Sequence, residues 1–167
     1  YYNRFLFVTP QGEVTKYDKR HLFRMAKEQE TYEMGSERVI INYMGWRILP
    51  MVCYDLRFPV WSRNNNDYDL MIYVASWPDL RSFAWKTLSQ ARAIENLSYL
   101  VSCNRVGEDI KMKYSGDSAI YNFKGETLAN LKPYSQGVIN FSLSLEELEK
   151  YRNNFPAHLD ADKFLLQ

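Results

Sequence analysis

Cys53 is the residue whose type and setting could do chemistry most directly. It ends a short apolar run that begins at Ile48, and charged and aromatic residues follow it at once. A run of this kind is typical of a buried strand, and a cysteine at a strand end can point into a pocket as a nucleophile. An inert core cysteine has similar apolar neighbours, so other residues must decide between the two interpretations.

One of two charged residues earlier in the chain, Lys19, could assist such a nucleophile. Lys19 comes just after an early strand and lies among aromatic residues, and Glu28 lies in the charged run from Lys27 to Glu30. An ammonium group near a thiol favours the thiolate, because the ordinary cysteine pKa of about 8.5 leaves the thiol mostly protonated at neutral pH. A solvated surface position is the alternative for each charged residue taken alone.

Short apolar strands, alternating with fewer helices, must hold these residues in place. The predicted strands cover residues 1–8, 38–42, 47–53, 69–75, 99–104, 119–122, 127–131 and 138–141. The second and third of these are separated by a turn and are expected to form a hairpin. Apolar residues recur at helical spacing from Ser82 to Asn96, and a capping box at Ser144 starts a short helix that runs to about Asn153. This alternation predicts an α/β sandwich in which helices cover sheets.

Composition and charge limit the possible functions. The 167 residues are 46% hydrophobic, which is enough for one core and predicts a single domain. The 21 basic and 20 acidic residues are interleaved and give a net charge of +1, which favours neither a nucleic acid nor a membrane as partner. No apolar run approaches the length needed to span a bilayer.

The cysteines and histidines predict no disulfide framework and no metal site. Cys53 and Cys103 both lie in apolar strand-like runs, which suits a reducing cytoplasm, and Cys103 is expected in the core. Together with His21 and His158 they lack the short spacing that metal ligands usually have.

Three motifs, read in order, resemble a known family. They are Tyr17-x-Lys19-x-His21-Leu22-Phe23, then Glu28 with Gly35, then Cys53-Tyr54-Asp55-x-Arg57-Phe58-Pro59. Further matching segments follow in the expected order: Tyr68-Asp69-Leu70, Ala75-Ser76-Trp77-Pro78, Ala91 to Asn96, Cys103 to Gly107, Gly116-Asp117-Ser118, and the tail from Phe155 to Phe164. The ordered set is similar to the nitrilase superfamily of carbon-nitrogen hydrolases, and within it to the omega-amidase-like branch.

The resemblance implies a four-layer α-β-β-α sandwich, of which residues 1–167 form a partial carbon-nitrogen hydrolase domain. The general-base glutamate of the family lies on an early strand, and no residue here matches it. We therefore expect that the first third of the fold is absent from this sequence, and that these residues alone are inactive. Leu6, Phe7 and Val8 are expected to pack against polypeptide that the sequence does not contain.

The resemblance also implies a chemistry that needs no cofactor. Cys53 would be the nucleophile that attacks an amide carbonyl, loses ammonia and leaves a thioester for water to hydrolyse. Lys19 would stabilise the thiolate and, with the backbone N–H of Tyr54, the tetrahedral oxyanion. Glu28 would orient the lysine and the substrate.

The substrate implied by the omega-amidase branch is a short oxo-dicarboxylic monoamide such as 2-oxoglutaramate or 2-oxosuccinamate. Its distal carboxylate requires a cation, and Arg81 or Arg105 could supply one because both follow strands on the expected side of Cys53. Surface ion pairing is the alternative for both arginines. Trp77 is expected to line the substrate site, and Arg57 to brace the turn after the nucleophile.

The resemblance implies a homodimer or larger homo-oligomer, with residues 155–164 lying across the partner or along the subunit's own edge. Other functions stay open at this point. The substrate could be another amide or a carbamoyl compound, or a Cys-His dyad could use His21 or His158. The chain could also be a catalytically incomplete module for binding or oligomerisation.

Overall fold

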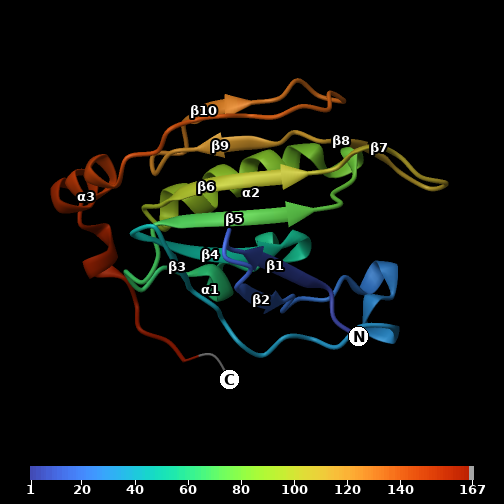
Figure 1. Cartoon of the computed structure of the whole chain (residues 1–167), viewed down its shortest axis with the longest axis horizontal. Coiled ribbons are helices and arrows are strands. Elements are labelled where there is room, and N and C mark those ends of the chain that lie inside the picture. The colour runs from blue at the N-terminus through green and yellow to red at the C-terminus, as the bar shows by residue number, and fades with distance from the viewer. Residues whose placement is uncertain (166–167) are drawn as a thin grey trace.

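A mixed sheet forms the centre of the structure, a computed structural model that describes residues 1–165. Its six strands lie in the order β10-β9-β6-β5-β4-β3 (Figure 1). Their bounds are Ile41–Tyr43 for β3, Trp46–Val52 for β4, Leu70–Ala75 for β5, Tyr99–Asn104 for β6, Ala119–Tyr121 for β9 and Thr127–Asn130 for β10.

The three central strands, β4, β5 and β6, are parallel; β3 pairs antiparallel with β4 and β9 with β6, and β10 pairs antiparallel with β9 at the edge. Val52 at the end of β4 lies opposite Val74 of β5, which in turn lies opposite Cys103 of β6. The residues that follow these strands therefore meet at one edge of the sheet, which is where α/β proteins usually place ligand sites.

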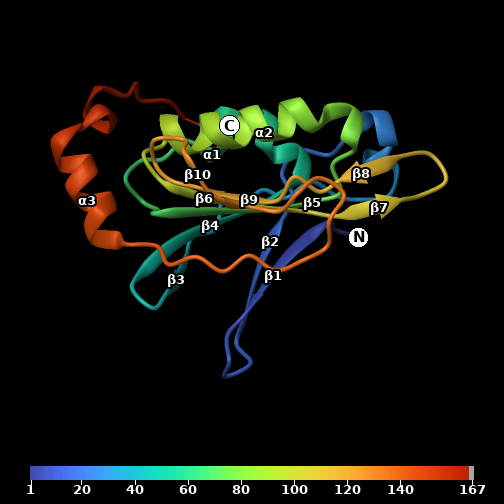
Figure 2. The ribbon, with the colours of Figure 1, turned by 90° about the horizontal axis from the view of Figure 1, so that it is seen from above.

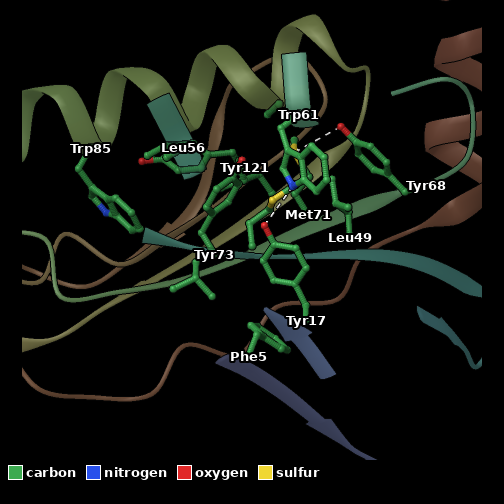
Figure 3. Packing of buried hydrophobic residues seen from close by; sticks show 14 of the residues in the cluster. Phe5, Tyr17, Leu49, Leu56, Trp61, Tyr68, Met71, Tyr73, Trp85 and Tyr121 are labelled. Atoms are coloured by element: carbon green, nitrogen blue, oxygen red, sulfur yellow. Dashed lines mark hydrogen bonds between the residues drawn. The ribbon is translucent and has the colours of Figure 1, made fainter. Parts of the chain in front are cut away.

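Helices cover one face of this sheet. Helix α2, Ser82–Glu95, runs along it beside the short helix α1, Pro59–Ser62 (Figure 2). The core between these layers is strongly aromatic, with Trp85, Tyr68 and Tyr73 fully buried (Figure 3). Alternate residues of β4 point into it, as the strand period of two requires.

The opposite side of the sheet carries a hairpin and part of the C-terminal region. Strands β1, Arg4–Val8, and β2, Val14–Asp18, pair antiparallel, and their connecting turn projects away from the sheet on the side opposite α2 (Figure 2). Helix α3, Leu145–Asn154, begins as predicted at Ser144, whose hydroxyl accepts a hydrogen bond from the N–H of Glu147 at 3.2 Å.

The remaining elements are short and lie mostly around the carboxyl edge. A second hairpin, β7–β8, pairs Val106–Glu108 with Lys113–Ser115. The 3-10 turns are η1 Arg24–Ala26, η2 Glu28–Glu30, η3 Cys53–Arg57, η4 Asp79–Arg81 and η5 Ala157–Asp160. No helix within residues 1–165 is both long and apolar enough to cross a membrane.

Most of the predicted elements are confirmed, and two expectations are wrong. Residues 138–141 form no strand; they belong to an extended segment in which Val138 is exposed and pairs with no neighbouring strand. Cys103 is not in the core but exposed, because it lines an open cavity together with Val101 and Ile139.

Candidate active site

Cys53 lies directly after β4 and opens the turn η3, as the sequence predicts. Its φ angle is +47°, in the left-handed region that residues with a Cβ rarely adopt. Such a conformation is unfavourable unless its surroundings enforce it, and it is found preferentially at functional sites. Here it turns the chain sharply at the carboxyl edge of the sheet.

Lys19 and Glu28 form an ion pair next to this turn. Lys19 is 1% exposed, and its Nζ lies 2.9 Å from Oε1 and 2.6 Å from Oε2 of Glu28. Glu28 Oε2 also accepts a hydrogen bond from the backbone N–H of Phe23 at 2.8 Å. The Glu28 carboxylate thus contacts both the Lys19 ammonium group and the backbone of the segment between these two residues.

One cavity of about 550 Å³ joins these three residues. Cys53, Lys19 and Glu28 all line it, and the β7–β8 hairpin closes one side with residues from Asp109 to Tyr114. The structure therefore brings together the three side chains that the sequence predicts as catalytic. The wall formed by β7–β8 was not predicted, because residues 106–115 give only a weak strand pattern.

Burial determines the protonation of the Cys53 thiol. Its pKa is raised above the ordinary value because burial disfavours the thiolate, and this outweighs the opposing effects of the Lys19 cation and a hydrogen bond from the Ser76 backbone. The lysine acts in the expected direction, but it does not make the resting thiol acidic. Burial thus opposes formation of the thiolate, whereas Lys19 favours it.

The backbone and aromatic residues around Cys53 complete the pocket. Tyr54 is the second residue of η3, in the first turn, where backbone N–H groups have no partner within a helix. Trp77 is 3% exposed and, with Cys53 and Tyr54, lines a small recess of about 40 Å³. Its indole N–H donates to the carbonyl of Arg81 at 2.8 Å, so Trp77 is a fixed part of the wall.

The two predicted carboxylate-binding arginines lie in different places. Arg81 lines the main cavity, where its guanidinium lies 5.5 Å from the ring centroid of Phe23 and forms no salt bridge within residues 1–165. Arg105 does not line that cavity. It stacks 4.2 Å from the ring centroid of Tyr114 and lies 3.8 Å from Asp109.

Arg105 follows β6 and lies at a second cavity of about 480 Å³, which residues 101–106 all help to line. The side chain of its neighbour Asn104 exchanges hydrogen bonds with the Trp77 backbone at 2.7 and 3.0 Å. A prediction from the strand end alone does not distinguish the two cavities.

Asp55, rather than Arg57, braces the turn after Cys53. Arg57 is exposed, with its guanidinium 5.2 Å from the ring centroid of Trp77. Asp55 is fully buried and accepts a hydrogen bond from the backbone N–H of Val52 at 3.2 Å. The motif contained Asp55, but a contact across such a turn leaves no periodic signal in the sequence.

Neither histidine forms a dyad with Cys53 within the described part of the chain. His21 Nδ1 lies 2.8 Å from Asp55, and its ring stacks on Phe58 at 3.8 Å. His158 lies in η5, after α3. Among residues 1–165 no three His, Cys, Asp or Glu side chains are grouped so that they could hold a metal ion.

Comparison with known proteins matches this chain to hydrolases. A family model described as carbon-nitrogen hydrolase matches residues 1–153. Omega-amidase YafV of Yersinia enterocolitica is 55% identical over 165 residues, which are 98% of this chain and 64% of that protein. The 2-oxoglutaramate amidase of Bacillus subtilis (strain 168) is 31% identical over 167 residues, with coverage of 98% and 64%.

A solved structure is also very similar. XC1258 from Xanthomonas campestris, described as a CN-hydrolase superfamily protein with an arsenic adduct in the active site, has a TM-score of 0.96 and 45% identity, covering 99% of this chain and 66% of that chain. The chain thus spans 64% of the length of the two curated relatives.

Proposed function

Because this chain belongs to the carbon-nitrogen hydrolase family, we propose that it hydrolyses a short ω-amide, of the 2-oxoglutaramate or 2-oxosuccinamate type, to a carboxylate and ammonia. One observation carries the proposal: Cys53, the buried Lys19 and Glu28 line one cavity at the carboxyl edge of the sheet. The relatives named omega-amidase and 2-oxoglutaramate amidase support this class of substrate.

The proposed reaction has two halves. The Cys53 sulfur attacks the amide carbonyl carbon, and the resulting oxyanion is stabilised by the Lys19 ammonium and the N–H of Tyr54. The C–N bond breaks, and the nitrogen takes up a proton and leaves as ammonia. Water then attacks the thioester, which releases the carboxylate and restores the thiol. Glu28 holds Lys19 in place throughout.

The proton of Cys53 needs an acceptor. Two carboxylates of the described chain line the cavity, Glu28 and Asp109, and both already accept hydrogen bonds. Asp109 accepts from the backbone N–H groups of Lys111 and Met112 and from the Tyr114 hydroxyl. These contacts support the prediction that the general base lies outside these residues, and that residues 1–167 alone release ammonia at least about 100-fold more slowly than a longer protein.

The charges of the cavity suit a substrate that carries a carboxylate. Lys19 and Glu28 compensate each other, whereas Arg81 and Lys111 line the cavity without a salt bridge inside residues 1–165. We propose that Arg81 binds the distal carboxylate of the ω-amide and that Trp77 forms the wall beside it. Arg105 lies outside this cavity, where it contacts Tyr114 and Asp109, and is not proposed to bind the substrate.

The chain has the α/β fold of the nitrilase superfamily, with a mixed sheet and covering helices. We propose that this sheet is one inner layer of a four-layer α-β-β-α sandwich. The face opposite α2 supports this, because Leu6 and Val8 are 58% and 57% exposed and Cys103 is exposed as well. An intact mass greater than that of 167 residues is expected for the purified protein, and an equal mass would contradict the proposal.

The proposed assembly is a homodimer or larger homo-oligomer in the cytoplasm. Phe155 and Leu159 of the C-terminal region are 54% and 74% exposed, which is consistent with a segment that packs on another surface. Light scattering coupled to size exclusion would measure the assembly, and a monomer at micromolar concentration would contradict this part.

A panel of amides tests the proposed reaction. We expect the full-length protein to release ammonia from 2-oxoglutaramate and 2-oxosuccinamate, and a mass spectrum of quenched enzyme to show an acyl adduct on Cys53. Cys53→Ala and Lys19→Ala should abolish release, whereas Cys103→Ala should not. If no short amide in the panel releases ammonia, the chain is a binding module and not an enzyme.

A further inference from the structure

Asp55 is a fully buried carboxylate with contacts to four polar groups. Its Oδ2 accepts from the Tyr17 hydroxyl at 2.7 Å and from the Val52 N–H at 3.2 Å. Its Oδ1 accepts from the His21 N–H at 2.9 Å and lies 2.8 Å from the ring Nδ1 of the same residue. The carboxylate thus joins two segments that are far apart in the sequence.

These two segments carry the lysine and the nucleophile. Tyr17 and His21 flank Lys19, and Asp55 itself follows Cys53 in the turn η3. We propose that Asp55 is a positioning residue, which sets the place of the Lys19 ammonium relative to the Cys53 sulfur and so the strength with which the cation acts on the thiol. The inference rests on the proposed function, because it assigns Asp55 a part in that reaction.

Tyr17 connects Asp55 to helix α1. It comes from β2, is fully buried, and its hydroxyl oxygen accepts a hydrogen bond from the indole N–H of Trp61 in α1 at 3.0 Å (Figure 3). The same hydroxyl donates to Asp55 at 2.7 Å. Burial, and then the charge of Asp55, raises the pKa of Tyr17 far above its usual range, so the hydroxyl remains a donor at every working pH.

The nucleophile turn needs such a brace. Cys53 has a φ angle of +47°, and Phe58 closes the turn through a hydrogen bond from its N–H to the Asp55 carbonyl at 3.0 Å. A misplacement of reacting groups by about 1 Å can cost about 100-fold in rate. A carboxylate that contacts both sides of the site can prevent such a displacement.

The test measures how strongly Lys19 acts on Cys53 with and without Asp55. The probe is iodoacetamide, and all proteins carry Cys103→Ser so that alkylation reports Cys53 alone. Lys19→Met should raise the pH midpoint of alkylation by about 1 unit when Asp55 is present. In the Asp55→Asn background the same change should produce less than about half that shift, because the cation is no longer held near the sulfur.

Two further variants separate positioning from general destabilisation. Tyr17→Phe removes one hydrogen bond to Asp55 and should also reduce the Lys19 effect, so it decides the matter if Asp55→Asn fails to fold. Asp69→Asn is the matched control. Asp69 is also buried and is paired with Arg47 and Arg152, but it precedes β5, at the opposite edge of the sheet.

The Asp69→Asn background should therefore retain the whole Lys19 effect. The proposal would be overturned if Lys19→Met shifted the alkylation midpoint by the full amount in folded Asp55→Asn protein. If Asp55→Asn does not fold, the same result in Tyr17→Phe protein would overturn it. Because alkylation needs no substrate, this result is independent of whether any amide is hydrolysed. A protein that hydrolyses no amide but shows the predicted loss of coupling would contradict the proposed function and not the contact between the two segments.

Discussion

Lys19 and Glu28 meet through two short contacts, 2.9 and 2.6 Å, from one ammonium to both oxygens of one carboxylate. The pair is buried on the lysine side and 19% exposed on the glutamate side. Burial of this kind makes removal of either partner costly, because the remaining charge loses its counterpart. The glutamate also lies close enough to Cys53 to raise the pKa of the thiol, although burial is the larger cause.

Glu28→Gln is therefore expected to make Cys53 easier to alkylate and at the same time to slow the release of ammonia. Removing the negative charge lowers the pKa of Cys53, so alkylation by iodoacetamide shifts to lower pH. Ammonia release falls about 100-fold, because Lys19 is no longer fixed. Glu30→Gln is the control: Glu30 lies in the same turn η2 but is exposed, and pairs with Lys27 at 3.5 Å. A Glu28→Gln enzyme with normal kcat would contradict the assigned role.

The sequence predicted Cys53, Lys19 and Glu28 as site residues because each lies in an ordered motif. It predicted the strands and the helix that hold them because the apolar residues of these elements recur with a strong periodicity. Strands β5 and β6 and helix α2 fall within one or two residues of the predicted bounds. The apolar residues around Val138 give a similar alternating pattern without a neighbouring strand to complete a ladder. Periodicity in a sequence predicts which side chains share a face of a strand, but not whether a neighbouring strand is present to pair with it.

What the sequence could not supply were contacts between distant segments. The hydrogen bond from Tyr17 to Asp55 joins residues 38 positions apart, and Arg105 is placed by its contacts with Tyr114 and Asp109. The sign of the Cys53 pKa shift also required the structure, because the effect of a nearby cation can be expected from type and spacing whereas burial cannot.

The raised pKa of Cys53 predicts how the alkylation of this residue depends on pH. Burial favours the protonated thiol, so at pH 7 a smaller fraction is thiolate than in an exposed cysteine. We expect alkylation of Cys53 by iodoacetamide at pH 7 to be slower than that of glutathione, and its pH midpoint to lie above that of an exposed cysteine. Peptide mass spectrometry would separate Cys53 from Cys103. A midpoint below pH 7 would contradict the environment described here.

Replacing Arg81 and replacing Arg105 should affect the binding of a substrate's carboxylate differently. Arg81→Met should raise KM for 2-oxoglutaramate by about 10- to 100-fold, which corresponds to one charged hydrogen bond of about 1.5–3 kcal/mol. It should leave hydrolysis of a neutral amide such as butyramide nearly unchanged. Arg105→Met is the control and should affect neither, because Arg105 lines a different cavity. Equal losses for charged and neutral amides in Arg81→Met would show that Arg81 shapes the pocket and does not bind the carboxylate.

Gly35 links the stability of the fold to the position of Lys19. A Cβ on Gly35 would lie 2.1 Å from the backbone oxygen of Asp18, which cannot move aside as a side chain can. The Gly35 N–H also donates to the carbonyl of Lys19 at 2.9 Å, so relief of the clash must shift the lysine segment.

Gly35→Ala should therefore reduce both stability and activity. We expect a cost of about 1–3 kcal/mol, seen as a Tm lowered by about 5 °C, together with a lower kcat for ammonia release. Gly137→Ala provides the comparison, because its Cβ would approach only the Leu131 side chain, at 3.1 Å, and that side chain can rotate. If Gly35→Ala lowered Tm but left kcat intact, the Gly35 contact would support the fold without controlling the position of Lys19.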